Sequence, residues 1–155
     1  MKKIVIFLLI LMLFSIVNAE TQERRIYQTA RSGSEKPVID GKIDDEVWNR
    51  VEWTGDFIQR TPYENEAPSQ ETKFKILYDD KNIYLGFRAY DTEPEKITSI
   101  TAPRDWFPGD WVEVNIDSYF DKRTAFSFTL SVSGVRGDEF ISDDGDNWDT
   151  SWNPI

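Results

Sequence analysis

The chain has 155 residues, none of them cysteine or histidine, and its 28 acidic against 18 basic side chains give a formal net charge of −10 at pH 7. These absences exclude disulfides, a Ser-His-Asp triad, a Cys-His pair and histidine metal sites. The acidic balance disfavours nucleic acid and anionic lipid as partners, and it favours calcium or neutral partners such as sugars. The same charge would also serve simply to keep a domain soluble.

The N-terminus has the pattern of a cleavable secretory signal peptide over residues 1–19. Two lysines precede an apolar run at 4–17, and small residues at 17–19 suit cleavage. The run is shorter than the roughly 20 residues that a membrane-spanning helix needs. We therefore expect an exported protein, located in the periplasm, at the cell surface or outside the cell. A polar segment without periodicity at 20–36 is expected to be a flexible leader.

The ordered domain is expected at 37–155. It opens with a short strand that ends in an Asp-Gly turn at 37–41. Three acidic residues at 44–46 then precede apolar residues at helical spacing, which predicts one or two helical turns. Trp48 is expected to lie in the core there.

Two pairs of alternating segments predict two β-hairpins. A four-residue turn joins the first pair, 72–78 and 83–90, and a polar turn joins the second pair, 110–117 and 124–132. On the last of these segments we expect the apolar side chains to face inward and the small ones outward. The expected inward residues are Phe126, Phe128, Leu130 and Val132, and the expected outward residues are Ala125, Ser127, Thr129 and Ser131.

Several short strands with regular turns and little helix predict an all-β fold, an antiparallel β-sandwich of jelly-roll type. A sandwich with so few strands has an open sheet edge, which proteins usually avoid. We therefore expect that the C-terminal strands are missing and that the domain at 37–155 is truncated.

Several groups of residues occur in an order that is found in one known family. They are Pro37-Val38-Ile39-Asp40-Gly41 with Asp44 and Trp48, Phe74-Lys75-Ile76-Leu77-Tyr78-Asp79-Asp80 with Tyr84-Leu85, Asp91, Asp110-Trp111-Val112-Glu113-Val114-Asn115-Ile116-Asp117, and Phe126-Ser127-Phe128. The ordered set resembles the family 9 carbohydrate-binding module, in the version at the front of large bacterial envelope proteins. The resemblance implies a β-sandwich that binds sugar and can hold structural calcium.

The resemblance also implies a site in which two tryptophans hold the sugar and polar side chains bond its hydroxyls. Glu113 matches the family's Glu, and Trp106 lies near the place of the first tryptophan. Thr129 and Ser131 stand where the family has Arg and Asn. The resemblance implies that the second tryptophan and the last strands of the family lie beyond Ile155.

The residues themselves indicate a binding patch at the same place. Trp106, Trp111, Glu113 and Asn115 lie together at the start of one predicted strand, opposite its core residues. Sugar rings stack their C–H faces on aromatic planes, and their hydroxyls need hydrogen-bond partners. The alternative is that Trp111 belongs to the core and Trp106 holds a loop in place.

The second dense cluster is acidic. Asp143, Asp144 and Asp146 supply hard oxygen ligands at close spacing, which suits calcium. A solvated acidic turn is the alternative.

We therefore predict a non-catalytic carbohydrate-binding module of an exported protein, with a polysaccharide or oligosaccharide as partner. By resemblance it is linked to breakdown of that polysaccharide by an associated glycoside hydrolase. Glu113 and Asp117 share a face but lie roughly 13 Å apart along a strand, whereas glycosidase carboxylates lie roughly 5–9.5 Å apart. Carboxylate pairs on different strands stay open, so catalysis in this segment is undecided.

The alternative belongs to another class. The domain would be a structural or interaction module that fronts an outer-membrane envelope protein, with a decayed sugar site. Its link to the outer membrane would run through the missing C-terminal region.

Overall fold

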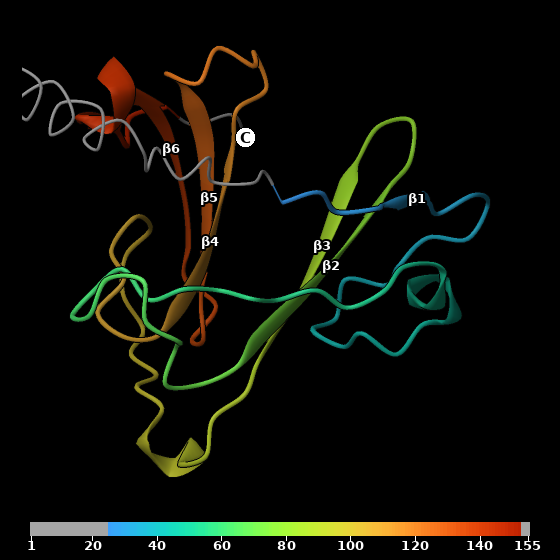
Figure 1. Ribbon diagram of the computed structural model, residues 1–155, viewed down its shortest axis with the longest axis horizontal. Coiled ribbons are helices and arrows are strands. Elements are labelled where there is room, and N and C mark those ends of the chain that lie inside the picture. Colours follow the sequence, from blue (N-terminus) through green and yellow to red (C-terminus); the bar gives the residue numbers. More distant parts are fainter. Residues whose placement is uncertain (1–24, 153–155) are drawn as a thin grey trace, which may run out of the picture.

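Two β-sheets form the part of the chain that the computed structural model describes, residues 25–152 (Figure 1). One sheet has the strand order β1-β2-β3 and the other β4-β5-β6-β7. The strands are β1 (Ala30–Arg31), β2 (Thr72–Tyr78), β3 (Ile83–Ala89), β4 (Trp111–Ile116), β5 (Ala125–Ser131), β6 (Arg136–Ser142) and β7 (Asn147–Asp149). The predicted all-β sandwich class is confirmed.

Helical structure within residues 25–152 is limited to short 3-10 helices. They are η1 (Glu46–Arg50), η2 (Pro94–Lys96) and η3 (Asp143–Gly145). The helical turns predicted after the acidic residues at 44–46 correspond to η1. No helix in this described part is long and apolar enough to cross a membrane. The signal peptide predicted at 1–19 lies outside the described residues.

The first sheet is built on the predicted hairpin, in which β2 and β3 pair antiparallel. Asp79 closes the loop between them. Its carboxylate accepts hydrogen bonds from the backbone N–H groups of Lys81 and Asn82, both at 2.7 Å, and from the Tyr84 hydroxyl at 2.8 Å. An Asp that bonds the backbone two residues ahead is a local turn device, so the sequence alone was enough to locate this turn.

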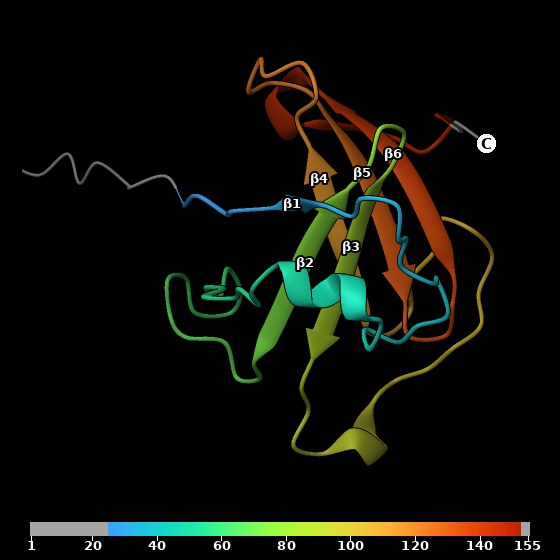
Figure 2. The ribbon, with the colours of Figure 1, turned by 90° about the vertical axis from the view of Figure 1, so that its right-hand side faces the viewer.

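The most deeply buried apolar side chains lie between η1 and the first sheet. Val47, Trp48 and Val51 pack against Leu77, and each of the four is at most 5% exposed. Figure 2 shows η1 crossing the face of β2 and β3 that is turned away from the second sheet. The buried Lys75 supports the packing, because its Nζ donates to the carbonyl of Trp48 at 2.8 Å. The prediction that Trp48 lies in the core is confirmed.

The first sheet begins earlier in the chain than Pro37. β1 pairs in parallel with the end of β2. The Tyr27 hydroxyl accepts a hydrogen bond from the backbone N–H of Ile76 at 3.1 Å, and Ser32 is fully buried. Residues within the segment 20–36, which the sequence presents as a leader without periodicity, therefore contribute to the sheet. These residues show no alternation of apolar and polar side chains, because backbone pairing and a few single side-chain contacts hold them against the sheet.

The second sheet contains the other predicted hairpin. β4 pairs antiparallel with β5, and β6 and β7 extend the sheet. The alternation of apolar and polar residues on β5 is as predicted, but the burial is reversed from Ser127 onward, while Ala125 and Phe126 are both half-buried. Ser127, Thr129 and Ser131 are buried, whereas Phe128, Leu130 and Val132 are 40 to 51% exposed.

The reversed burial on β5 has a cause in the tertiary structure. Figure 1 shows the segment 98–110 on the side of β4–β6 that is turned away from the first sheet. Its Phe107 ring lies against Gly137, and the Ser133 hydroxyl donates to the carbonyl of Ile100. The apolar side of β5 meets a sheet of only three strands, one of which has two residues. Alternation along a strand defines two faces, but it does not say which face the rest of the chain covers.

Candidate functional site

One face of the second sheet gathers most of the residues that the sequence singles out for ligand binding. Cross-strand partners point to the same side of a sheet, so the pairing of β4, β5 and β6 brings three rows together. The rows are Trp111 with Ser131, Glu113 with Thr129 and Gly137, and Asn115 with Ser127 and Glu139. We call this surface, which lies away from the first sheet, the outer face of β4–β6.

Glu113 is at the centre of this face. Its Oε1 accepts a hydrogen bond from Asn115 Nδ2 at 2.8 Å, and its Oε2 accepts one from Thr129 Oγ1 at 3.3 Å. The half-buried carboxylate is therefore held in one orientation from two strands. Three of the predicted site residues thus form a single hydrogen-bonded cluster.

Ser131 has a different role from its neighbours. Its Oγ shares a hydrogen bond with Ser133 Oγ at 2.9 Å and accepts one from the backbone N–H of Val135 at 3.0 Å. The residue is buried. These bonds close the turn between β5 and β6, so the hydroxyl of Ser131 is used within the protein.

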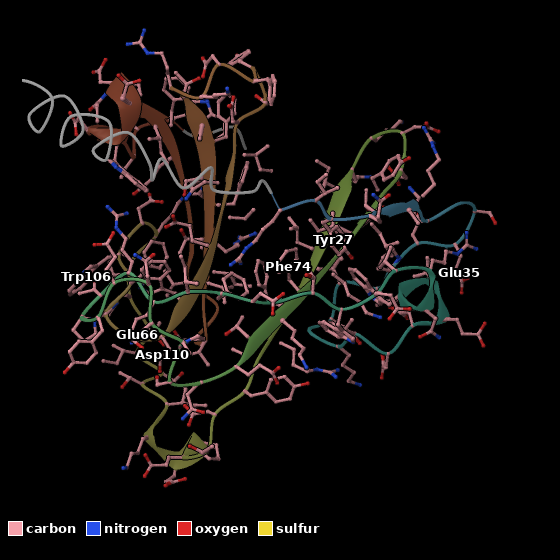
Figure 3. The ribbon with its side chains drawn as sticks, viewed as in Figure 1. Tyr27, Glu35, Glu66, Phe74, Trp106 and Asp110 are labelled. Carbon is pink, nitrogen blue, oxygen red and sulfur yellow. The ribbon has the colours of Figure 1, made fainter. Side chains whose placement is uncertain are left out.

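Two exposed tryptophans flank the outer face. Trp106 is 62% exposed and Trp111 is 50% exposed, which is too much for core residues. Figure 3 shows Trp106 on the opposite side of the second sheet from Phe74 of the first. The Trp111 ring is supported by Phe107, with ring centroids 6.3 Å apart and planes inclined by 49°. Both tryptophans present aromatic surface to solvent.

The loop that carries Trp106 is anchored along the edge of β6. The backbone N–H of Asp105 donates to the carbonyl of Arg136 at 3.3 Å, and the N–H of Asp138 donates to Asp105 Oδ1 at 3.3 Å. The Phe107 ring lies directly against Gly137. Sequence reasoning missed Asp105 and Phe107. The only signal was Gly137, because a glycine within a strand often marks a close approach by another part of the chain.

The outer face is negatively charged. Burial raises the pKa of Glu139, and the negative charges of Glu113 and Asp105 raise it further. Arg104 contacts the carboxylate of Asp138, and its Nε lies 3.8 Å from Asp105 Oδ2. Within residues 25–152, no ion pair joins a basic side chain to Glu113 or Glu139.

The acidic residues at the end of β6 are close together in the sequence, but their carboxylates do not form one group in the described structure. Asp143 and Asp144 lie in η3, and Asp146 follows it. Asp144 Oδ1 accepts a hydrogen bond from Arg123 Nε at 2.9 Å. In the described part of the chain, no three acidic, histidine or cysteine side chains are grouped so that they could hold a metal. Calcium binding stays a prediction.

Comparison with known proteins gives one match. The model of a family described as carbohydrate family 9 binding domain-like matches residues 39–138, which is more than half of the chain. The matched range contains Trp106, Trp111, Glu113 and Thr129. No curated protein and no solved structure matches the chain.

Proposed function

The chain belongs to the carbohydrate family 9 binding domain-like family, and on that premise we propose that the outer face of β4–β6 binds a polysaccharide or oligosaccharide. The observation that carries this proposal is the exposed ring of Trp111 on the same face as the oriented carboxylate of Glu113, with the exposed Trp106 on the loop that contacts β6. Pyranose rings stack on aromatic planes through their C–H faces. Their hydroxyls then donate hydrogen bonds to a fixed acceptor at the edge of the stack.

Each residue has a defined part in this mode of binding. The tryptophans supply apolar surface, and the Glu113 carboxylate accepts from sugar hydroxyls through lone pairs that Asn115 and Thr129 leave unused. The hydrogen bonds from Asn115 and Thr129 fix the carboxylate before a ligand arrives. A group that is already oriented loses less conformational entropy on binding.

The proposal extends to the setting of the domain. The signal-like sequence at the N-terminus supports export, and a partnership with enzymes that degrade polysaccharides is what the resemblance in the sequence implies. We accordingly assign the domain to the recognition of a polysaccharide outside the cytoplasm, with hydrolysis supplied by an associated glycoside hydrolase.

A specific observation favours the second candidate, a structural or interaction module with a decayed sugar site. Ser131 stands where the resemblance implies a sugar-binding Asn, and its hydroxyl is used within the β5–β6 turn. Thr129 has neither the length nor the charge of an Arg. If both positions were needed for binding, this chain would have lost the function.

Calorimetric titration distinguishes the two candidates. The protein is titrated with soluble xylan, with a soluble cellulose derivative, and with cello-, xylo- and glucosamine oligosaccharides of equal length. The proposed function predicts saturable binding to at least one of them, which Glu113→Gln weakens. Absence of heat with every sugar, from a protein shown to be folded by its melting curve, would reject carbohydrate binding and leave the structural module.

A further inference from the structure

The outer face of β4–β6 is rich in hydrogen-bond acceptors and poor in free donors. Glu113 and Glu139 both project from it, and the charge of Asp105 reaches Glu139 from the loop at 102–109. The side-chain donors beside Glu113 are Asn115 Nδ2 and Thr129 Oγ1; the Thr129 hydroxyl and one of the two Asn115 N–H groups already donate to Glu113. A ligand that approaches these carboxylates therefore finds oxygen lone pairs with few N–H or O–H groups to match its own acceptors.

Ser127 adds an independent sign that the site is incomplete without a ligand. Its cross-strand partners are Asn115 and Glu139, so its side chain points to the same face as theirs. The residue is fully buried, and its Oγ has no hydrogen-bond partner within the described residues. Buried hydroxyls are normally paired, so this one leaves an unused polar group beneath the carboxylates.

The chemistry of the ligand follows from this imbalance. We propose, as a consequence of the carbohydrate-binding function above, that the outer face prefers sugars with a free amino group, namely hexosamine units that are not N-acetylated. An ammonium group brings three donors and a positive charge, and it has no lone pair that needs a donor. Hydrogen bonds between charged partners are about twice as strong as those between neutral ones.

The same comparison disfavours other sugars. A neutral hexose offers hydroxyl groups that both donate and accept hydrogen bonds. Their oxygen lone pairs find few donors at this face. An N-acetyl group carries no charge to pair with Glu113 and Glu139, and its carbonyl needs a donor where the Thr129 hydroxyl and one of the two Asn115 N–H groups already donate to Glu113. A uronic acid would bring a further negative charge to the carboxylates of Glu113, Glu139 and Asp105, which costs free energy. The amino sugar is the class that gains from the carboxylates of Glu113 and Glu139, which form no ion pair within residues 25–152.

The position of Trp111 relative to Glu113 also favours an amino sugar as the ligand. Trp111 begins β4 two residues before Glu113, so its exposed ring stands on the same face as the carboxylate. A sugar ring stacked on Trp111 would direct a ring substituent along the strand toward Glu113. Stacking alone does not distinguish a hexosamine from a hexose, so the discrimination is assigned to the carboxylates.

The test is a calorimetric titration of the full chain with three tetrasaccharides, made of glucosamine, N-acetylglucosamine and glucose, at a pH where the amine is protonated and carboxylates are ionised. We expect the glucosamine oligomer to bind tighter than the glucose oligomer by about tenfold or more, since a charge-assisted bond is worth about 1.5–3 kcal/mol. Added salt should reduce this preference.

Variants locate the source of the preference. Glu113→Gln and Glu139→Gln keep the shape of the side chain and remove its charge, so each should bring the affinity for the glucosamine oligomer close to that for the glucose oligomer. Glu95→Gln is the matched control, because Glu95 is exposed in η2, away from the outer face. Chitosan and de-N-acetylated strands of bacterial cell wall carry the same free amine. Binding to either supports the proposal, and the tighter ligand identifies the source.

The remaining outcomes overturn the proposal in distinguishable ways. Equal or tighter binding of the glucose or N-acetylglucosamine oligomer would reject the amino-sugar preference and leave carbohydrate binding intact. Absence of binding to any sugar would reject both. A preference that persists in Glu113→Gln and Glu139→Gln would also reject it.

Discussion

The ring of Phe107 lies so close to Gly137 that a Cβ on Gly137 would overlap ring atom Cζ and stand 3.0 Å from Cε2. The loop at 102–109 therefore meets β6 at a position where only a glycine fits. This contact places Phe107 under Trp111 and brings Asp105 to the edge of the sheet. The architecture of the site depends on a residue that makes no contact through a side chain.

Gly137→Ala should displace Phe107 and loosen the loop at 102–109. Overpacking of this kind costs about 1–3 kcal/mol, which denaturant unfolding measures. The double variant Gly137→Ala with Phe107→Ala removes the overlap, so its cost should be less than the sum of the two single costs. A Gly137→Ala protein with unchanged stability would show that the loop does not rest on β6.

Leu77 and Leu130 test the distribution of burial between the two sheets. Leu77 is fully buried against η1, whereas Leu130 on β5 is half exposed. Leu77→Ala should cost about 2–5 kcal/mol, and Leu130→Ala should cost about 1 kcal/mol or less. Chemical denaturation of the two variants under the same conditions gives the comparison. Equal losses, or a larger loss for Leu130→Ala, would mean that the apolar side of β5 is covered after all.

Asp79 should make the fold sensitive to acid. Hydrogen bonds from the Lys81 N–H first, and then from the Tyr84 hydroxyl and from Asn82, hold the pKa of its carboxyl well below the usual range. Because the folded pKa is depressed, this stabilisation is fully present above the unfolded pKa of about 4 and is lost as the pH falls toward the folded value.

The Asp79→Asn variant tests whether Asp79 contributes to the loss of folding stability at acid pH. It should lower the melting temperature at neutral pH and flatten the loss of stability on acidification below about pH 4. Asp146→Asn is the matched control, since Asp146 is an exposed Asp outside the hairpin. Acid melting curves that are the same for wild type and Asp79→Asn would contradict the role given to Asp79.

Trp106→Ala should separate binding from stability. The ring is mostly exposed, so the melting temperature should stay nearly unchanged. Loss of a stacking platform should weaken sugar binding by about 1–3 kcal/mol, the size found for bases stacked on aromatic side chains. Tyr63→Ala, another exposed aromatic, should leave affinity unchanged. A large drop in the melting temperature of Trp106→Ala would show that the ring supports the fold instead.

The parts of the fold that the sequence predicts well are those with local causes. The first hairpin follows from alternation on both sides of a turn that Asp79 closes, and η1 follows from acidic residues ahead of Val47 and Trp48. β1 has no such signal, since it is held by pairing with β2, more than forty residues away in the sequence.

The residues of the candidate site likewise fall into those that local sequence patterns predict and those that only tertiary structure brings together. Trp111, Glu113 and Asn115 share a face because of strand alternation, and pairing with β5 adds Thr129. Asp105, Phe107 and Glu139 come from a loop and a later strand, and only tertiary structure shows that they meet. The burial of Ser127 likewise depends on what covers the face, which no periodicity encodes.

The central claim is that the outer face of β4–β6 binds carbohydrate, and chemical-shift mapping by NMR tests it most directly. The isotopically labelled protein is titrated with the glucosamine, xylose and glucose oligosaccharides in turn. The account predicts that the largest changes fall on the amides of residues 104–115 and 127–139 and on the indole N–H groups of Trp106 and Trp111. Changes concentrated on η1 and on 75–88, across the first sheet, or no changes with any sugar, would contradict it.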